Sequence, residues 1–96
     1  MELKFVEIGK SLGTRELGAK TRNEILQNWD NSERIIFDFE DVRVVTNSFA
    51  DECFAKILDI KSLTELQSRT TFVNMSDIVL TSIVTAFNRK TSKMAK

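Results

Sequence analysis

The strongest hydrophobic pattern of the chain lies in residues 33–60. Apolar residues run almost without interruption from Ile35 to Phe39, and a short run of this composition is typical of a strand covered on both faces. Residues 42–45 continue the run after an acidic bend. The spacing then becomes helical, with apolar residues at Ala50, Cys53, Phe54, Ile57 and Leu58. We therefore predict a central strand followed by a helix over residues 48–60.

The N-terminal third of the chain predicts one strand and one helix. Residues 3–8 are rich in strand-forming side chains, and Gly9 and Gly13 bracket a loop that ends this strand. Thr14 is predicted to cap a helix of about four turns. One stripe of this helix is expected to face the core: Leu17, Thr21, Ile25 and Trp29.

The C-terminal third predicts a connection, a strand and a last helix. Residues 62–69 form the connection, with one helical turn that Ser62 would cap. Residues 70–74 form a short strand. Ser76 can then cap a helix in which Val79, Ile83, Ala86 and Phe87 share an apolar face that Leu80 and Val84 widen. Residues 88–96 are expected to form a frayed basic tail.

The alternation of strands and helices predicts an α/β fold. Connections of this kind give right-handed crossovers and parallel strands. We predict one domain over residues 1–96, with a mostly parallel four-stranded sheet flanked by three to four helices. The apolar fraction of 42% and the charged fraction of 29% are those of an ordinary globular protein.

The composition excludes several kinds of chemistry. The sequence contains no histidine, so catalytic triads and the usual zinc sites lack their commonest member. The glycines fit no nucleotide-binding fingerprint. The single cysteine, Cys53, lies in the apolar stripe of the central helix and is expected to be buried; a disulfide framework is therefore excluded and a reducing cytoplasm is favoured. We expect no signal peptide, no membrane segment, no cofactor and no enzymatic activity.

The charges are segregated along a chain whose net charge is zero. Residues 30–60 contain eight acidic and three basic side chains, whereas residues 61–96 contain two acidic and six basic ones. The acidic centre favours a basic protein partner over nucleic acid, with Asp51 and Glu52 as contact residues. The alternative is a nucleic-acid accessory protein that uses Arg89, Lys90, Lys93 and Lys96.

The turn before the central helix is the main candidate site. Ser48 and Asp51 have capping-box spacing, which predicts that Ser48 starts the helix. The free amides at such a position can also bind an anion, so a structural cap and a functional site both fit the pattern. Phe49 in the first turn is either an exposed partner contact or a core plug.

Residues 38–48 resemble the signature of the STAS domain, the family named from sulfate transporters and anti-sigma factor antagonists. Asp38 matches its strand aspartate, Val42 its valine, Val45 the buried residue before the turn and Ser48 its second serine. The string Thr-Asn-Ser-Phe-Ala-Asp-Glu at residues 46–52 is similar to a branch of small bacterial STAS-like proteins of unassigned function.

In anti-sigma factor antagonists the second serine is phosphorylated by an ATP-binding kinase that is also the anti-sigma factor. The resemblance therefore implies that Ser48 is a phosphorylation switch and that the partner is such a kinase-like protein. The chain departs from the signature at two positions, because Thr46 stands in place of an aspartate and Phe49 in place of a glycine.

Together, the patterns predict a cytoplasmic regulatory module that binds a protein partner. Ser48 is the proposed switch, and the expected contact residues are Thr46, Asn47, Phe49, Asp51 and Glu52. A constitutive adaptor in which Ser48 is only a cap is the alternative within the same class. The sequence leaves the oligomeric state open.

Overall fold

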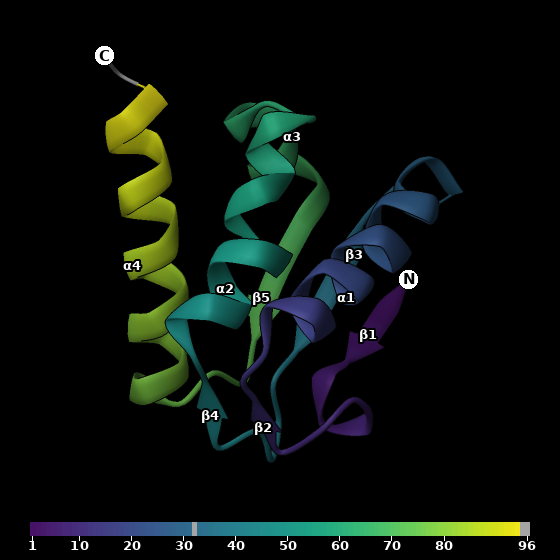
Figure 1. Cartoon of the computed structure of the whole chain (residues 1–96). Helices are drawn as coiled ribbons and strands as arrows, with labels where there is room; N and C mark the ends of the chain where they lie inside the picture. The colour runs from purple at the N-terminus through teal and green to yellow at the C-terminus, as the bar shows by residue number, and fades with distance from the viewer. Residues whose placement is uncertain (32, 95–96) are drawn as a thin grey trace.

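Two small parallel sheets form the β structure of the protein, seen in a computed structural model that describes residues 1–31 and 33–94. The main sheet has the strand order β1-β3-β5. The second sheet pairs β2 with β4 (Figure 1). The strands are β1 (Glu2–Lys4), β2 (Ser11–Leu12), β3 (Ile35–Asp38), β4 (Val44–Val45) and β5 (Thr70–Val73).

The predicted four-stranded sheet is therefore wrong, although the parallel α/β class is confirmed. Residues 44–45 do not extend β3, because the chain turns at Asp41, which has a left-handed φ of 65°. Beyond this turn β4 pairs with β2. The segment between Gly9 and Gly13, predicted as a loop, thus contains a strand.

The helical segments include four α-helices and three 3₁₀-helices within the described part of the chain. The α-helices are α1 (Arg15–Gln27), α2 (Asn47–Cys53), α3 (Leu63–Arg69) and α4 (Asp77–Met94). The 3₁₀-helices are η1 (Phe5–Glu7), η2 (Trp29–Asn31) and η3 (Ala55–Asp59). The helix predicted over residues 48–60 is thus an α-helix that gives way to a 3₁₀-helix.

Local signals identified three of the helix starts correctly. The hydroxyl oxygens of Thr14, Ser62 and Ser76 accept hydrogen bonds from backbone amides three residues later. Several boundaries differ from the predictions. The first strand ends at Lys4, because Phe5–Glu7 form η1, and α3 fills Leu63–Arg69, where a connection with one helical turn was predicted. Trp29 lies in η2, just beyond α1, and residues 88–94 belong to α4 and do not fray. Residues 95–96 lie outside the described part.

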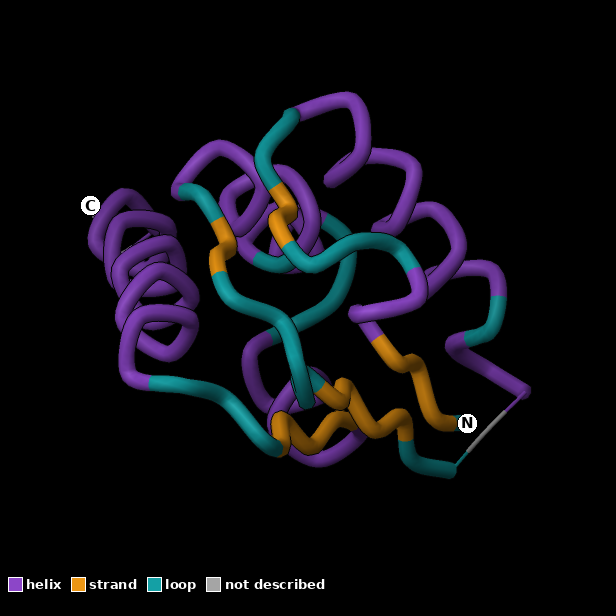
Figure 2. The backbone as a smooth tube through the Cα atoms, turned by 90° about the horizontal axis from the view of Figure 1, so that it is seen from below, coloured by secondary structure: helices purple, strands orange, loops and turns teal. Residues whose placement is uncertain are grey.

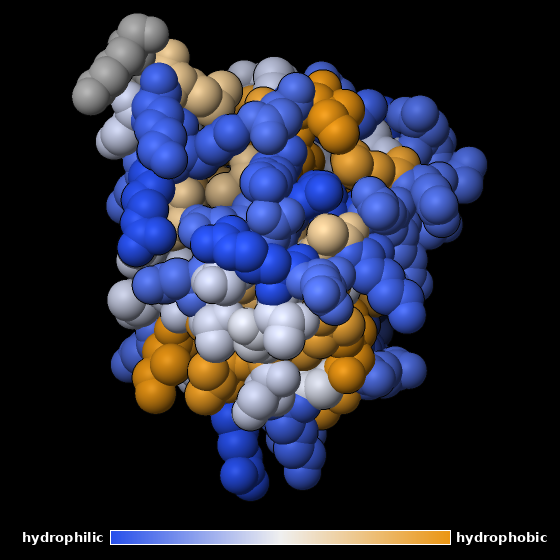
Figure 3. Space-filling view, in the orientation of Figure 1, coloured by the Kyte–Doolittle hydropathy of each residue, from blue (hydrophilic) through white to orange (hydrophobic). Residues whose placement is uncertain are grey.

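Helices α1, α2 and α4 cover one face of the main sheet, with α2 between the other two (Figures 1 and 2). The middle of the surface they present is largely hydrophilic (Figure 3). None of the helices in residues 1–31 and 33–94 is long and apolar enough to cross a membrane.

The core between sheet and helices is built from aromatic rings. Leu3, Phe37 and Phe72 stand in register on the inner face of the sheet. Phe54, directly after α2, is fully buried and touches the rings of Phe5, Phe37, Phe39, Phe49 and Phe72. On the other face of β3, Ile36 is only partly buried, so the expected cover on both faces is wrong.

Gly18 allows α1 and α2 to cross very closely. A Cβ atom at this position would lie 2.9 Å from Cβ of Glu52 and 3.0 Å from the carbonyl oxygen of Phe49. Both distances are shorter than ordinary van der Waals contact. Any larger residue would therefore push the two helices apart.

We predict that Gly18→Ala destabilises the protein. Overpacking costs about 1–3 kcal/mol, whereas alanine gains roughly 1 kcal/mol over glycine inside a helix. The expected net loss in free energy of unfolding is about 1 kcal/mol, measured by urea denaturation. Gly13→Ala is the control, since its Cβ would lie 3.6 Å from Thr46 Cγ2, in ordinary contact. Equal stability of both variants would contradict the tight crossing.

Candidate functional site

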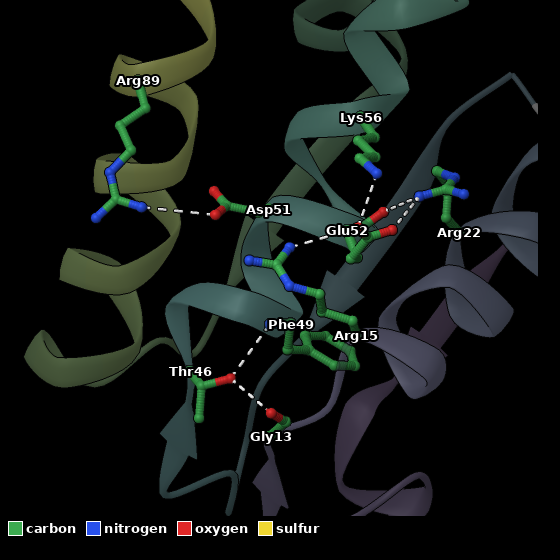
Figure 4. A network of polar contacts seen from close by, with 9 residues as sticks. All are labelled: Gly13, Arg15, Arg22, Thr46, Phe49, Asp51, Glu52, Lys56 and Arg89. Carbon is green, nitrogen blue, oxygen red and sulfur yellow. Dashed lines mark hydrogen bonds and ion pairs between the residues drawn. The ribbon is translucent and has the colours of Figure 1, made fainter.

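Thr46 caps α2 and ties its start to the loop before α1. Its hydroxyl oxygen accepts from the backbone amide of Phe49 at 3.2 Å, and the same hydroxyl donates to the carbonyl oxygen of Gly13 at 3.0 Å (Figure 4). Thr46 has the extended backbone typical of a capping residue. The prediction that Ser48 is the cap is therefore wrong, because Ser48 already lies inside the first turn.

The first turn has two polar side chains that reach solvent and one buried aromatic ring. Asn47 is exposed and Ser48 is half-buried, whereas Phe49 is fully buried. The Phe49 ring packs edge-on against Phe5 and Phe54. Of the two alternatives for Phe49, the core plug is confirmed. Phe49 is consequently not available as a surface contact for a partner.

Asp51 and Glu52 are both engaged in ion pairs within the chain. Asp51 pairs with Arg89 of α4 at 3.5 Å. Glu52 is more deeply placed, with 13% of its side chain exposed. Its carboxylate lies 2.7 Å from Lys56, 3.3 Å from Arg22 and 3.4 Å from Arg15 (Figure 4).

Glu52 acts as a junction between α1, α2 and η3. The guanidinium of Arg22 also donates to the backbone carbonyl of Glu52, so one arginine binds both the side chain and the backbone of this residue. The hydrogen bond from Lys56, followed by that from Arg22, holds the pKa of Glu52 below its usual value, although burial acts in the opposite direction. Glu52 thus serves the packing of the helices.

Most of the cations around these acids, but not Arg22, line a groove between α2 and α4 that also includes residues of α1 and η3. The groove has a volume of about 260 Å³. Its lining is Arg15, Asp51, Ala55, Lys56, Ala86, Arg89, Lys90 and Lys93. Lys90 also pairs with Asp59. The expected acidic face of the central helix is therefore flanked by basic side chains, which sequence order alone did not reveal.

A larger apolar groove lies between α3, β5 and α4. Its volume is about 520 Å³, and none of its lining side chains is charged. Leu63, Leu80 and Val84 contribute exposed apolar surface at this groove. The helical spacing of Leu80 and Val84, which widen the apolar face of the last helix, was a partial signal for this groove.

Asp38, which matches the STAS strand aspartate, joins the ends of two strands. Its carboxylate accepts from the amide of Glu40 and from the side-chain nitrogen of Asn74, each at 2.9 Å. The bond from Asn74, then that from Glu40, lowers the pKa of Asp38. The aspartate therefore orders the chain after β3 and β5.

In the part of the chain that the structure describes, the cysteine and the acidic residues form no metal centre. Cys53 is buried as predicted, and burial raises the pKa of its thiol. Within residues 1–31 and 33–94, no group of three or more histidine, cysteine or acidic side chains is placed to hold a metal ion.

Comparison with known families gives one match, which covers most of the chain. Residues 18–80 match the sequence model of a family described as a STAS-like domain of unknown function (DUF4325). The matched range includes β3, α2, α3 and β5, and therefore the turn at the start of α2. Comparisons with curated proteins and with solved structures give no match.

We predict that Thr46→Ala and Ser48→Ala differ in stability. Loss of a threonine cap costs about 1–2 kcal/mol, and Thr46 also bonds to Gly13. Ser48→Ala should change the free energy of unfolding by less than about 0.5 kcal/mol, because it removes no cap. Urea denaturation of both variants measures the difference. If Ser48→Ala lost more free energy of unfolding than Thr46→Ala, Ser48 would be the capping residue after all.

A second prediction follows from the lowered pKa of Glu52. Because its folded-state pKa lies below the unfolded value, its ion pairs stabilise the protein fully above about pH 4.5 and are lost as the pH falls through the folded pKa. Glu52→Gln should therefore cost about 1 kcal/mol at pH 7 and less at pH 3, measured by thermal unfolding. The exposed Glu24→Gln is the control. A cost that does not depend on pH would contradict this role.

Proposed function

Because the chain belongs to the STAS-like family of unknown function (DUF4325), whose model covers residues 18–80, we propose that it is a small cytoplasmic regulatory module without enzymatic activity. The module binds a protein partner through the exposed surface at the start of α2. Asn47 and Ser48 form the centre of this surface, since both side chains reach solvent.

The observation that carries this proposal is that Thr46, and not Ser48, caps α2. A serine that completes a cap has a structural reason to be there. Here Thr46 performs that task, which leaves the Ser48 hydroxyl available for modification. Ser48 is also the residue that matches the phosphorylated serine of anti-sigma factor antagonists.

We propose phosphorylation of Ser48 as the switch and an ATP-binding, kinase-like anti-sigma factor as the class of partner. A phosphate adds nearly two negative charges at neutral pH. A partner seated over the turn would have to bury this charge, and an unpaired buried charge costs about 3–5 kcal/mol. Phosphorylation would therefore release the partner while the fold persists.

The departures from the STAS signature favour an alternative function, a constitutive adaptor. Thr46 and Phe49 replace residues that are an aspartate and a glycine in the signature, and in this protein one is a cap and the other a core residue. The partner therefore meets a different surface from that of an anti-sigma factor antagonist. A constitutive adaptor, in which partner binding is not controlled through Ser48, is the second candidate.

The test uses Ser48→Asp as a mimic of the modified protein. We expect this variant to keep its melting temperature within a few degrees of the parent. Its affinity for the partner should fall by a factor of a hundred or more, because a cost of about 3–5 kcal/mol weakens binding tenfold for each 1.4 kcal/mol. Affinity purification from the native host with the parent protein and the variant, followed by binding measurements with the captured partner, checks this.

Two control variants accompany this test. Ser48→Ala should still bind, and Ser68→Asp, which adds the same charge on the exposed surface of α3, should bind as well as the parent. Unchanged binding by Ser48→Asp would favour the adaptor. Mass spectrometry of the protein purified from the host reports whether Ser48 carries a phosphate.

A further inference from the structure

We propose that the groove between α2 and α4 receives an acidic segment of the partner. This inference rests on the proposed role of α2 as the partner-binding surface, and it reverses the expectation, drawn from the acidic residues 30–60, that the partner is basic. Basic side chains of α1, η3 and α4 surround Asp51 and Glu52 and favour an acidic ligand.

The groove lies next to the first turn of α2. Ser48 and Asp51 are three residues apart and share one side of the helix. Asp51 and Ala55 both line the groove. A segment that packs over Ser48 would therefore extend naturally into it.

Basic side chains outnumber acidic ones around the groove. Five cations line it: Arg15, Lys56, Arg89, Lys90 and Lys93. Asp51 is the one acid in the lining, and the acids next to it are Glu52 and Asp59, which pair with these cations. Within the described part of the chain, Lys93 forms no ion pair. The local charge is therefore positive although the whole protein is neutral.

The acids at the centre are also more deeply placed than their cations. Asp51 has 24% of its side chain exposed, whereas its partner Arg89 has 53%. Glu52 has 13% exposed, against 58% for Arg15 and 46% for Lys56. The pair of Lys90 and Asp59 is the exception, since there the acid is the more exposed member. At the Asp51 and Glu52 pairs, a ligand would thus meet the cations first.

The floor of the groove leaves room for a side chain. Ala55 and Ala86 are small and almost fully buried, and they lie among the longer basic residues. A carboxylate in this space could accept hydrogen bonds from Arg89 and Lys93, and charge-assisted bonds of this kind are strong. The volume of the groove, about 260 Å³, suits a few side chains of a peptide.

A titration of the full chain tests this proposal. The probe is a short synthetic glutamate peptide, and a glutamine peptide of equal length is the neutral control. We expect the glutamate peptide to shift the backbone amide signals of Lys56, Ala86, Arg89 and Lys93 in ¹⁵N NMR spectra, and the shifts to weaken as salt is added. The glutamine peptide should leave them unchanged.

The decisive variant is Arg89→Gln/Lys93→Gln. Removing two exposed cations should weaken binding of the glutamate peptide by about fivefold to tenfold, with the melting temperature within a few degrees of the parent. Lys10→Gln/Lys20→Gln is the matched control, because it removes the same net charge at exposed positions outside the groove. Lys20 also lies on the opposite side of α1 from Gly18, which faces α2.

Three outcomes would overturn the proposal. These are no shift in the groove, equal weakening in both double variants, or preferential binding of a short DNA duplex over the glutamate peptide at the same residues. The last result would favour the nucleic-acid accessory role instead. The titration involves neither a Ser48 variant nor the native partner, so its failure is distinguishable from failure of the switch at Ser48.

Discussion

The close crossing of α1 and α2 at Gly18 is the constraint on which the site depends. Because Gly18 has no Cβ atom, α1 approaches the backbone of Phe49 and the side chain of Glu52. This approach brings Arg22 onto both the carboxylate and the backbone carbonyl of Glu52. A carboxylate with so little exposure requires compensating charge, and Arg15 and Lys56 supply the rest. One glycine thereby determines which charges the surface of α2 presents.

A second interaction determines what the first turn of α2 presents. Thr46 bonds forward to Phe49 and across to Gly13, so it fixes the start of α2 against the loop that precedes α1. The buried Phe49 ring anchors the same turn in the phenylalanine core. With the cap and the anchor provided by its neighbours, Ser48 lies in a turn whose two flanking residues are fixed by hydrogen bonds and ring packing. Such a position suits a residue whose modification would change the binding of a partner.

Much of the fold could be predicted because its signals are local. The helical spacing of apolar residues and the Thr14, Ser62 and Ser76 caps depend only on residues a few positions apart. The four-stranded sheet failed for the opposite reason. Val44 and Val45 look like an extension of β3, yet their partners are Ser11 and Leu12, which lie in a segment that composition marks as a loop. Strands that pair across such a long stretch of sequence produce no periodic pattern of residues from which the pairing could be predicted.

The sequence by itself determined the order of the elements, the burial of Cys53, the turn that precedes the central helix and the STAS-like family, because each is encoded in neighbouring residues. Only the tertiary structure decided that Thr46 rather than Ser48 is the cap, since Thr46 also bonds to the distant Gly13, that Phe49 is core and that Asp51 and Glu52 are paired. Glu52 meets Arg15 and Arg22 across 37 and 30 residues of sequence. Charge segregation along the chain predicted an acidic surface, but electrostatic interactions depend on distance in space, and folding places basic helices on both sides of the acidic one.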